Sequence, residues 1–236
     1  MKPEQTVTAL EEDLNALNKK IEKLGKLAIA QFSGAIDGMA TFDTEHLNSI
    51  ISQDKLLDDL ELSINDDAFL LISLRAPVVT DLRRVIVAIK ISSILERVGD
   101  YAKNIAKRSK ILAEQGSDTI PGVNIGRMGQ LAEEMLTEVI NAYLTRDVSK
   151  AIKIRDRDLE IDYMYTAFYR EILTSMARNP EQISNGTHLL FIAKNIERIG
   201  DYATGIAEQI YFLIHGTTLE DDRPKADPLT SSNKET

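Results

Sequence analysis

The chain reads Glu96-Arg97-Val98-Gly99-Asp100-Tyr101-Ala102, and the same pattern returns as Glu197-Arg198-Ile199-Gly200-Asp201-Tyr202-Ala203. Ile-Ala follows each copy at the same distance, at positions 105–106 and 206–207. The only difference within the seven residues exchanges valine for isoleucine, which keeps that position apolar. Two stretches that agree residue by residue predict an internal duplication of one structural unit.

Further features repeat ahead of each copy, in the same order. They are an aspartate pair four residues apart (Asp54 and Asp58; Asp158 and Asp162) and an arginine two residues before a proline (Arg75 and Pro77; Arg178 and Pro180). A single aspartate also precedes each pair by eleven residues, at Asp43 and Asp147. The repeat therefore covers most of each half of the chain.

Amphipathic periodicity typical of helices runs along nearly the whole chain, without the alternating pattern of a strand. It predicts six long helices, over about residues 7–40, 44–74, 80–115, 126–145, 148–177 and 183–216. The prolines at 77 and 180 bend the chain, because a proline disfavours helical conformation in the residue before it. The predicted fold is all-α, with two tandem repeats of a three-helix bundle.

Composition suggests where the repeats begin and end. Turn-forming residues at 116–122 predict a linker between a first repeat (residues 1–118) and a second repeat (residues 122–216). Because one three-helix unit is small, we expect two separately cored repeats that pack side by side. Residues 217–236 are polar, contain two prolines and lack periodicity, so they are predicted to form a disordered tail.

Composition and charge also exclude several classes of protein. The apolar fraction of 43% suffices for a sizeable core, and the absence of cysteine excludes disulfides and thiolate zinc sites. A net charge of −9 argues against a nucleic-acid partner and, on charge alone, against free inorganic phosphate as a direct ligand. Cations or a basic partner surface fit better. The chain shows no signal-peptide pattern and no stretch long enough to span a membrane, so we expect a cytoplasmic protein.

Each half carries two pairs of acids on different predicted helices: Asp54/Asp58 with Glu96/Asp100, and Asp158/Asp162 with Glu197/Asp201. Acids four residues apart share one face of a helix. Counted from the bend at a rise of about 1.5 Å per residue, the two acid pairs of each half lie at similar heights along their antiparallel helices. Four converging carboxylates predict a site for hard cations such as Mg, Mn, Ca or iron. On the third predicted helix the acids lie opposite the apolar arc, so we expect the site to be open at the surface.

Other interpretations of these acids stay open at this stage. They could be solvated acidic faces, partly neutralised by Arg97 and Arg198, because like charges four residues apart cost only a few tenths of a kcal/mol. They could belong to a metal-dependent hydrolase, although no nucleophile with its base and no glycine-rich phosphate loop accompanies them. A metal-storage protein is a third class. The repetition of a costly arrangement favours metal binding. We expect Gly99 and Gly200 to allow close helix contact or access to the acids.

The repeated motif resembles the signature of the PhoU family. The resemblance is carried by Leu74-Arg75-Ala76-Pro77 and Asp81-Leu82-Arg83, by Leu95 to Ala106 and by Ile196 to Ala203, and it covers residues 10–216. It implies an accessory protein of the phosphate-specific transport system, which is a regulatory adaptor without catalysis. Such a protein is a negative regulator of phosphate uptake and of the phosphate-starvation response, and it links the phosphate ABC transporter to a sensor histidine kinase.

The resemblance also implies partners and metals. Family members are usually dimers, so we expect a homodimer that contacts the transporter ATPase and the kinase, and reaches the membrane only through them. Some members bind iron or zinc clusters through paired acidic motifs, so iron or zinc is expected here, with Mg or Mn as alternatives. The implied ligands are Asp54, Asp58, Glu96, Asp100, Asn104, Asp158, Asp162, Glu197 and Asp201. The second motif has Gly205 in place of Asn104, so we expect its site to bind metal more weakly.

Overall fold

The computed structural model describes residues 3–116 and 123–219, which form long helices and one short 3-10 helix. The helices are α1 (Pro3–Thr41), α2 (Thr44–Arg75), α3 (Val79–Glu114), α4 (Val123–Thr145), α5 (Val148–Arg178) and α6 (Ile183–His215), with η1 at Pro180–Gln182. The prediction of an all-α protein with six helices is confirmed. The predicted linker and tail lie largely outside the described residues. None of the described helices has a stretch apolar and long enough to span a membrane.

The same turn joins the first two helices of each repeat. Asp43 and Asp147 are the N-caps of α2 and α5, and each carboxylate accepts a hydrogen bond of 3.0 Å from the backbone N–H three residues ahead. Such caps satisfy N–H groups that the first turn of a helix leaves without a partner. The residue before each cap has a left-handed backbone, with φ of 53° at Phe42 and 56° at Arg146. The sequence repeat therefore corresponds to a repeat of local structure.

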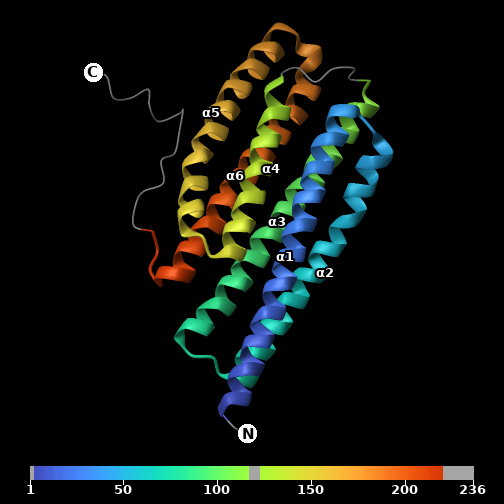
Figure 1. Cartoon of the computed structure of the whole chain (residues 1–236). Coiled ribbons are helices and arrows are strands. Elements are labelled where there is room, and N and C mark those ends of the chain that lie inside the picture. Colours follow the sequence, from blue (N-terminus) through green and yellow to red (C-terminus); the bar gives the residue numbers. More distant parts are fainter. Residues whose placement is uncertain (1–2, 117–122, 220–236) are drawn as a thin grey trace, which may run out of the picture.

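The two repeats lie side by side with their hairpins pointing in opposite directions. In Figure 1 the bend between α2 and α3 lies near the N-terminus, and the bend between α5 and α6 lies at the far end of the molecule. Within each repeat all three helices contact one another. Contacts of α3 with α6 and of α1 with α4 join the repeats.

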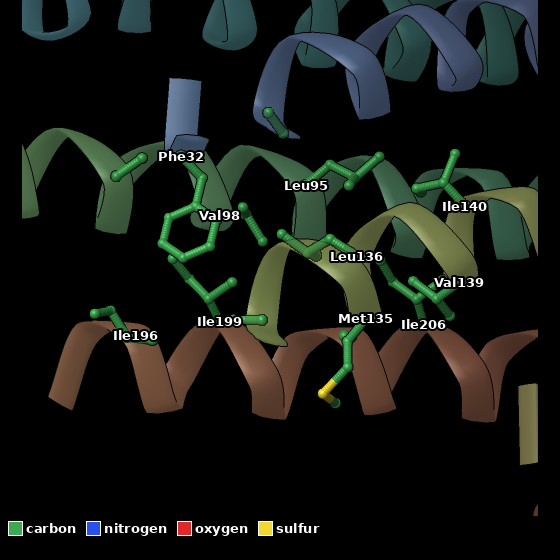
Figure 2. Packing of buried hydrophobic residues seen from close by; sticks show 14 of the residues in the cluster. Phe32, Leu95, Val98, Met135, Leu136, Val139, Ile140, Ile196, Ile199 and Ile206 are labelled. Carbon is green, nitrogen blue, oxygen red and sulfur yellow. The ribbon is translucent and has the colours of Figure 1, made fainter. Parts of the chain in front are cut away.

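One hydrophobic core runs through both repeats. The buried apolar residues form a single cluster with members from all six long helices. Figure 2 shows part of it, with Phe32 and Val98 of the first repeat and Leu136 and Ile199 of the second. The prediction of two separate cores is therefore wrong. The contacting helices α1, α3, α4 and α6 each bury apolar side chains toward both repeats, so neither repeat completes its core alone.

The acidic clusters as a candidate metal site

The first acidic cluster comprises Asp54 and Asp58 on α2 and Glu96 and Asp100 on α3. One lysine of α3 binds acids of both helices. Lys103 Nζ donates a hydrogen bond of 2.6 Å to Asp100 Oδ1 and another to Asp54 Oδ2. Burial favours the neutral amine, but the hydrogen bonds to Asp100 and Asp54 outweigh it and raise the pKa of Lys103. The ammonium is thus the resident cation of this cluster.

The acids of the first cluster are close enough to repel one another. Partial desolvation, followed by the charge of Asp54, raises the pKa of Asp58. Burial, followed by the charges of Asp100 and Asp58, raises the pKa of Glu96. Each shift shows that neighbouring carboxylates disfavour another negative charge at that point. The predicted convergence of these four acids is therefore visible in their electrostatics.

Exposure differs among these residues. Asp54 is only 7% exposed, whereas Asp58 and Asn104 are exposed and Glu96 and Asp100 are half-buried. The acids of α3 do lie off the core, but the prediction that the whole site is open at the surface is wrong. That prediction was based on the helical phase of α3 alone, whereas α2 buries Asp54.

The second acidic cluster comprises Asp158 and Asp162 on α5 and Glu197 and Asp201 on α6. Asp158 is 1% exposed, so it is buried as its counterpart Asp54 is. Glu197 Oε2 pairs at 2.6 Å with Lys194 Nζ, three residues earlier on the same helix. Burial raises the pKa of Glu197, and Lys194 opposes that shift. The second cluster therefore has its own lysine, at a different place in the motif.

The glycine of each motif copy allows two helices to approach closely. A Cβ added at Gly99 would lie 2.6 Å from Leu57 Cδ2 of α2, and one added at Gly200 would lie 2.8 Å from Ile161 Cδ1 of α5. The Gly200 position would also be 3.0 Å from Asp158 Oδ1. Distances below 3.0 Å require the neighbour to move, so glycine at both places lets these side chains pack closely beside the acids.

The tyrosine of each copy faces the other repeat. The rings of Tyr101 and Tyr202 lie 5.7 Å apart between α3 and α6. Arg97 interacts with the side chain of Tyr202, which is the main reason for its raised pKa. Among the described residues neither Arg97 nor Arg198 forms an ion pair with an acid. The charges of Arg97 and Arg198 still oppose the raised pKa values of Glu96 and Glu197, while Lys103 and Lys194 form the ion pairs with acids of the clusters.

Both lysines were overlooked in the sequence, although a signal for them existed. Lys103 follows Asp100 by three residues and Lys194 precedes Glu197 by three, a spacing at which side chains on a helix meet. Because Lys103 and Lys194 do not occupy equivalent positions in the two repeats, a search limited to repeated residues does not find them.

The donor chemistry of both clusters suits a hard cation, because it is all carboxylate oxygen. The present side-chain arrangement is a poorer fit. Within residues 3–116 and 123–219, no three histidine, aspartate or glutamate side chains are placed together as ligands for one ion. In the first cluster Asp54 and Asp100 hold an ammonium instead. Metal binding at these acids therefore stays a prediction and would require side chains to rearrange.

Comparison with known proteins identifies the family. The PhoU domain model matches residues 21–109 and again 125–210. A phosphate-specific transport system accessory protein PhoU homologue of Caulobacter vibrioides is 43% identical over 227 residues, 96% of this chain and 99% of its own length. The crystal structure of PhoU from Pseudomonas aeruginosa aligns with a TM-score of 0.85 at 27% identity, over 88% of this chain and 99% of that one. The crystal structure of the phosphate transport system regulatory protein PhoU from Streptococcus pneumoniae aligns with a TM-score of 0.83 at 32% identity. The alignment covers 90% of this chain and 100% of that one.

The domain model accounts for both copies of the repeated motif, one in each matched segment. The relatives are described as accessory or regulatory proteins of phosphate transport, not as enzymes. The match to the family model, the identity to full-length relatives and the shared fold agree with the resemblance seen in the motif. The chain therefore belongs to the PhoU family, which is a family of accessory and regulatory proteins rather than of enzymes.

Proposed function

We propose that this protein is a cytoplasmic negative regulator of phosphate uptake and of the phosphate-starvation response. It acts as a homodimeric adaptor between the ATPase of a phosphate ABC transporter and a sensor histidine kinase, and it meets the membrane only through these partners. Family membership supports this role, since its relatives are named for phosphate-specific transport. An adaptor needs a surface on which partners dock, and the chain offers one.

The observation that carries the adaptor role is an exposed apolar tip at the bend between α2 and α3. The apolar tip comprises Phe69, Leu70, Leu74, Val78 and Val79, each between 55% and 74% exposed. Contiguous exposed apolar surface is typical of protein interaction sites, because leaving it in water is unfavourable.

The corresponding tip of the second repeat is less apolar. Ala177 stands where the first repeat has Leu74, and Glu181 and Gln182 stand where it has Val78 and Val79, while Leu173 and Ile183 are the exposed apolar residues there. Both tips are bends between two long helices, so the fold itself does not require apolar residues there. The apolar tip therefore fits a docking role for the first repeat.

The partners can be tested directly. Purified protein should retain the transporter ATPase and the cytoplasmic part of the kinase in a pull-down. Leu74→Arg, which places a charge in the apolar tip, should weaken retention about tenfold, while Ile152→Arg on exposed α5 surface should not. Cells without the protein should express phosphate-starvation genes in phosphate-rich medium. Normal repression in such cells would contradict the regulatory role.

We further propose that the two acidic clusters bind metal ions. The raised pKa values of Asp58 and Glu96 support a cation beside them, since a positive charge would relieve the repulsion between carboxylates. A metal at the first cluster would have to displace Lys103 from Asp54 or Asp100. Bound metal would supply charge neutralisation and a bridge between helices, not a reaction.

Metal analysis and melting curves test this proposal. Added iron, zinc, manganese or magnesium should raise the melting temperature of the wild type, because a ligand that binds only the folded state stabilises it. Asp100→Asn should reduce that gain more than Asp201→Asn, since Gly205 leaves the second cluster with one oxygen ligand fewer. Gly205→Asn should strengthen the second cluster. Identical responses of all four proteins would show that these acids are not metal ligands.

A further inference from the structure

A polar pocket of about 390 Å³ lies between the two repeats, where α1, α3, α6 and the end of α4 meet. We call it the inter-repeat pocket. Apart from one acid, Glu22, its polar lining comprises Asn15, Asn18, Lys19, Arg84, Tyr143 and Arg146. Its volume falls within the range of about 300–1,000 Å³ that is usual for small-molecule sites. None of these residues belongs to the acidic clusters or to the apolar tip.

The inter-repeat pocket gathers positive charge on a protein that is acidic overall. Three of its lining residues are cationic, against a net charge of −9 for the chain. Arg84 is already neutralised, because it pairs with Glu11 at 2.8 Å and with Asp81 at 3.3 Å. Lys19 and Arg146 form no ion pair with any residue of the described segments. These two cationic side chains are not held in ion pairs there, although the charge of Arg146 also acts on Glu11.

One acid also lines the pocket, and it is engaged elsewhere. Glu22 pairs with Lys26 at 2.6 Å, one turn along α1. Glu11 lies nearby, and its hydrogen bond to Arg84 is the main cause of its lowered pKa, with the charge of Arg146 adding to that effect. The acids around the pocket are therefore stabilised by cations other than Lys19, which remains available to a ligand.

The neutral donors of the pocket are held in place. Tyr143 is almost fully buried, and its hydroxyl donates a hydrogen bond of 2.8 Å to Asn18 Oδ1. Because the carbonyl oxygen of Asn18 is used by Tyr143, its amide N–H groups are left to donate to something else. Burial raises the pKa of Tyr143 to about 12, and the charges of Arg146 and Arg84 act against that shift. Both guanidinium groups therefore lie near the same hydroxyl.

The backbone places an arginine at the pocket against its own preference. Arg146 has φ of 56°, a left-handed conformation that costs a residue other than glycine roughly 1–2 kcal/mol. In the first repeat the matching residue is Phe42, which packs against the core. The same turn thus provides a core contact in one repeat and a cationic side chain over the pocket in the other.

We propose that the inter-repeat pocket binds a phosphoryl group, carried by free inorganic phosphate or by a small phosphate ester such as a nucleotide. Two cations that form no ion pair suit a doubly charged phosphate better than they suit a singly charged carboxylate. A guanidinium presents a planar pair of N–H donors suited to phosphate oxygens, and the amide N–H groups of Asn15 and Asn18 complete the set. The net charge of −9 for the whole chain argues against an anionic ligand, but the positive side chains at this pocket favour one.

The site would bridge the repeats, because Lys19 and Arg84 come from the first and Arg146 from the second. Binding would therefore stabilise the arrangement of the two repeats. This inference is independent of the partners proposed above, since a binding measurement on the purified chain needs no ATPase or kinase. It is also independent of the acidic clusters when the buffer contains no metal.

The test is titration calorimetry on the full chain in metal-free buffer, with inorganic phosphate in one arm and ATP in another, and sodium chloride at equal ionic strength as reference. We expect saturable binding in at least one arm. Arg146→Gln and Lys19→Gln should each weaken it about tenfold or more. Arg127→Gln makes the same charge change on α4 outside the pocket and should leave binding unchanged.

A stability measurement separates binding from folding. Arg146→Gly relieves the left-handed backbone and should melt at or above the wild-type temperature, yet it should lose the ligand as Arg146→Gln does. Binding of phosphate alone would identify the free anion as ligand, and binding of ATP alone would identify an ester; both outcomes support the proposal. Absence of saturable binding in both arms, or binding that survives Arg146→Gln, would overturn it.

Discussion

The two acidic clusters carry corresponding acids on corresponding helices, yet their counter-charges come from different places. In the first, Lys103 follows the motif and binds carboxylates of both α2 and α3. The matching residue in the second is Thr204, whose hydroxyl donates at 2.7 Å to a carbonyl of its own helix. The lysine of the second cluster is Lys194, ahead of the motif, where the first repeat has Ser93.

This difference teaches which part of the duplication is constrained. The acids and the glycine keep their helical positions, because a helix that approaches its neighbour closely leaves little freedom there. A counter-charge needs only to lie within reach, so it can move along the helix. The consequence is mechanical as well as electrostatic, since Lys103 connects two helices and Lys194 pairs within one. The two lysines therefore play different structural roles in their repeats.

The largest expected effect comes from separating the repeats. A fragment of residues 1–118 exposes the core side chains that α1 and α3 bury against the second repeat, including Phe32 and Val98. Loss of this burial at about 25 cal/mol per Å² should leave the fragment without a cooperative unfolding transition as a monomer. Denaturant unfolding followed by circular dichroism and sedimentation measures this. The fragment of residues 122–236 is the matched control and should behave in the same way.

A monomeric first-repeat fragment that unfolds as cooperatively as the full chain would contradict the continuous core. A stable fragment that sediments as a dimer would instead mean that two copies replace the missing repeat. The two results are distinguished by the sedimentation measurement alone.

The next largest effect is expected at Lys103. Lys103→Met leaves nearly buried Asp54 without its cation, and loss of one partner of such a pair costs about 2–3 kcal/mol. Lys194→Met should cost less, because it breaks a pair within one helix and Glu197 already has a raised pKa. Lys107→Met on the same helix controls for the loss of charge and should have little effect. Urea unfolding at neutral pH provides the comparison.

Equal losses in Lys103→Met and Lys107→Met would show that the link between α2 and α3 contributes nothing to stability. A metal ion offers a further check on the same variant. If the acids of the first cluster bind metal, added metal should restore more stability to Lys103→Met than to the wild type, because no ammonium competes for the site.

A smaller effect is expected at the motif glycine of the second repeat. Gly200→Ala places a Cβ 2.8 Å from Ile161 Cδ1 and should cost about 1–2 kcal/mol through overpacking. Gly205, five residues later on α6, meets nothing closer than Ile94 Cδ1 at 3.8 Å. Gly205→Ala should therefore be stabilising by up to about 1 kcal/mol, because alanine favours the helix. Thermal melting of the two variants shows whether contact with α5 or helix propensity decides how an added methyl group changes stability at these glycines.

Much of this architecture could be predicted from the sequence. The caps at Asp43 and Asp147 and the bends before Pro77 and Pro180 are local signals, and the helices begin and end near them. The heights of the acid pairs followed from the regular rise of a helix. The continuous core could not be predicted, because periodicity shows that a helix has an apolar face but not which other helix covers it.

The candidate site was predicted in part, for a similar reason. The matched pairs identified the acids, and the motif glycines indicated close helix contact. The burial of Asp54 and Asp158 depends on how α2 and α5 rotate against their partners, which one helix alone does not reveal. Lys103 and Lys194 occupy unmatched positions, so the repetition that made the acids conspicuous concealed their counter-ions.

The smallest expected effect concerns Glu96, an acid of the first cluster that Lys103 does not bind, and its pH dependence. Burial, then the charges of Asp100 and Asp58, raises the pKa of Glu96 above its ordinary value of 4.5. The folded state therefore holds this proton more tightly than the unfolded state, so ionisation of Glu96 removes stability as the pH rises through the raised pKa. Glu96→Gln should be more stable than the wild type at pH 7, by a few tenths of a kcal/mol. This advantage should vanish as the pH falls below the ordinary glutamate value, where the wild type is also neutral.

Glu208→Gln makes the same change of net charge on α6, outside both clusters, and should show no such pH-dependent gain. Urea unfolding of the three proteins between pH 4 and pH 7.5 measures the difference. A gain of equal size in both variants would assign it to the net charge of −9 and not to repulsion within the cluster. A gain confined to Glu96→Gln would mean that Lys103 leaves part of the first cluster uncompensated, because its ammonium binds Asp54 and Asp100 and not Glu96.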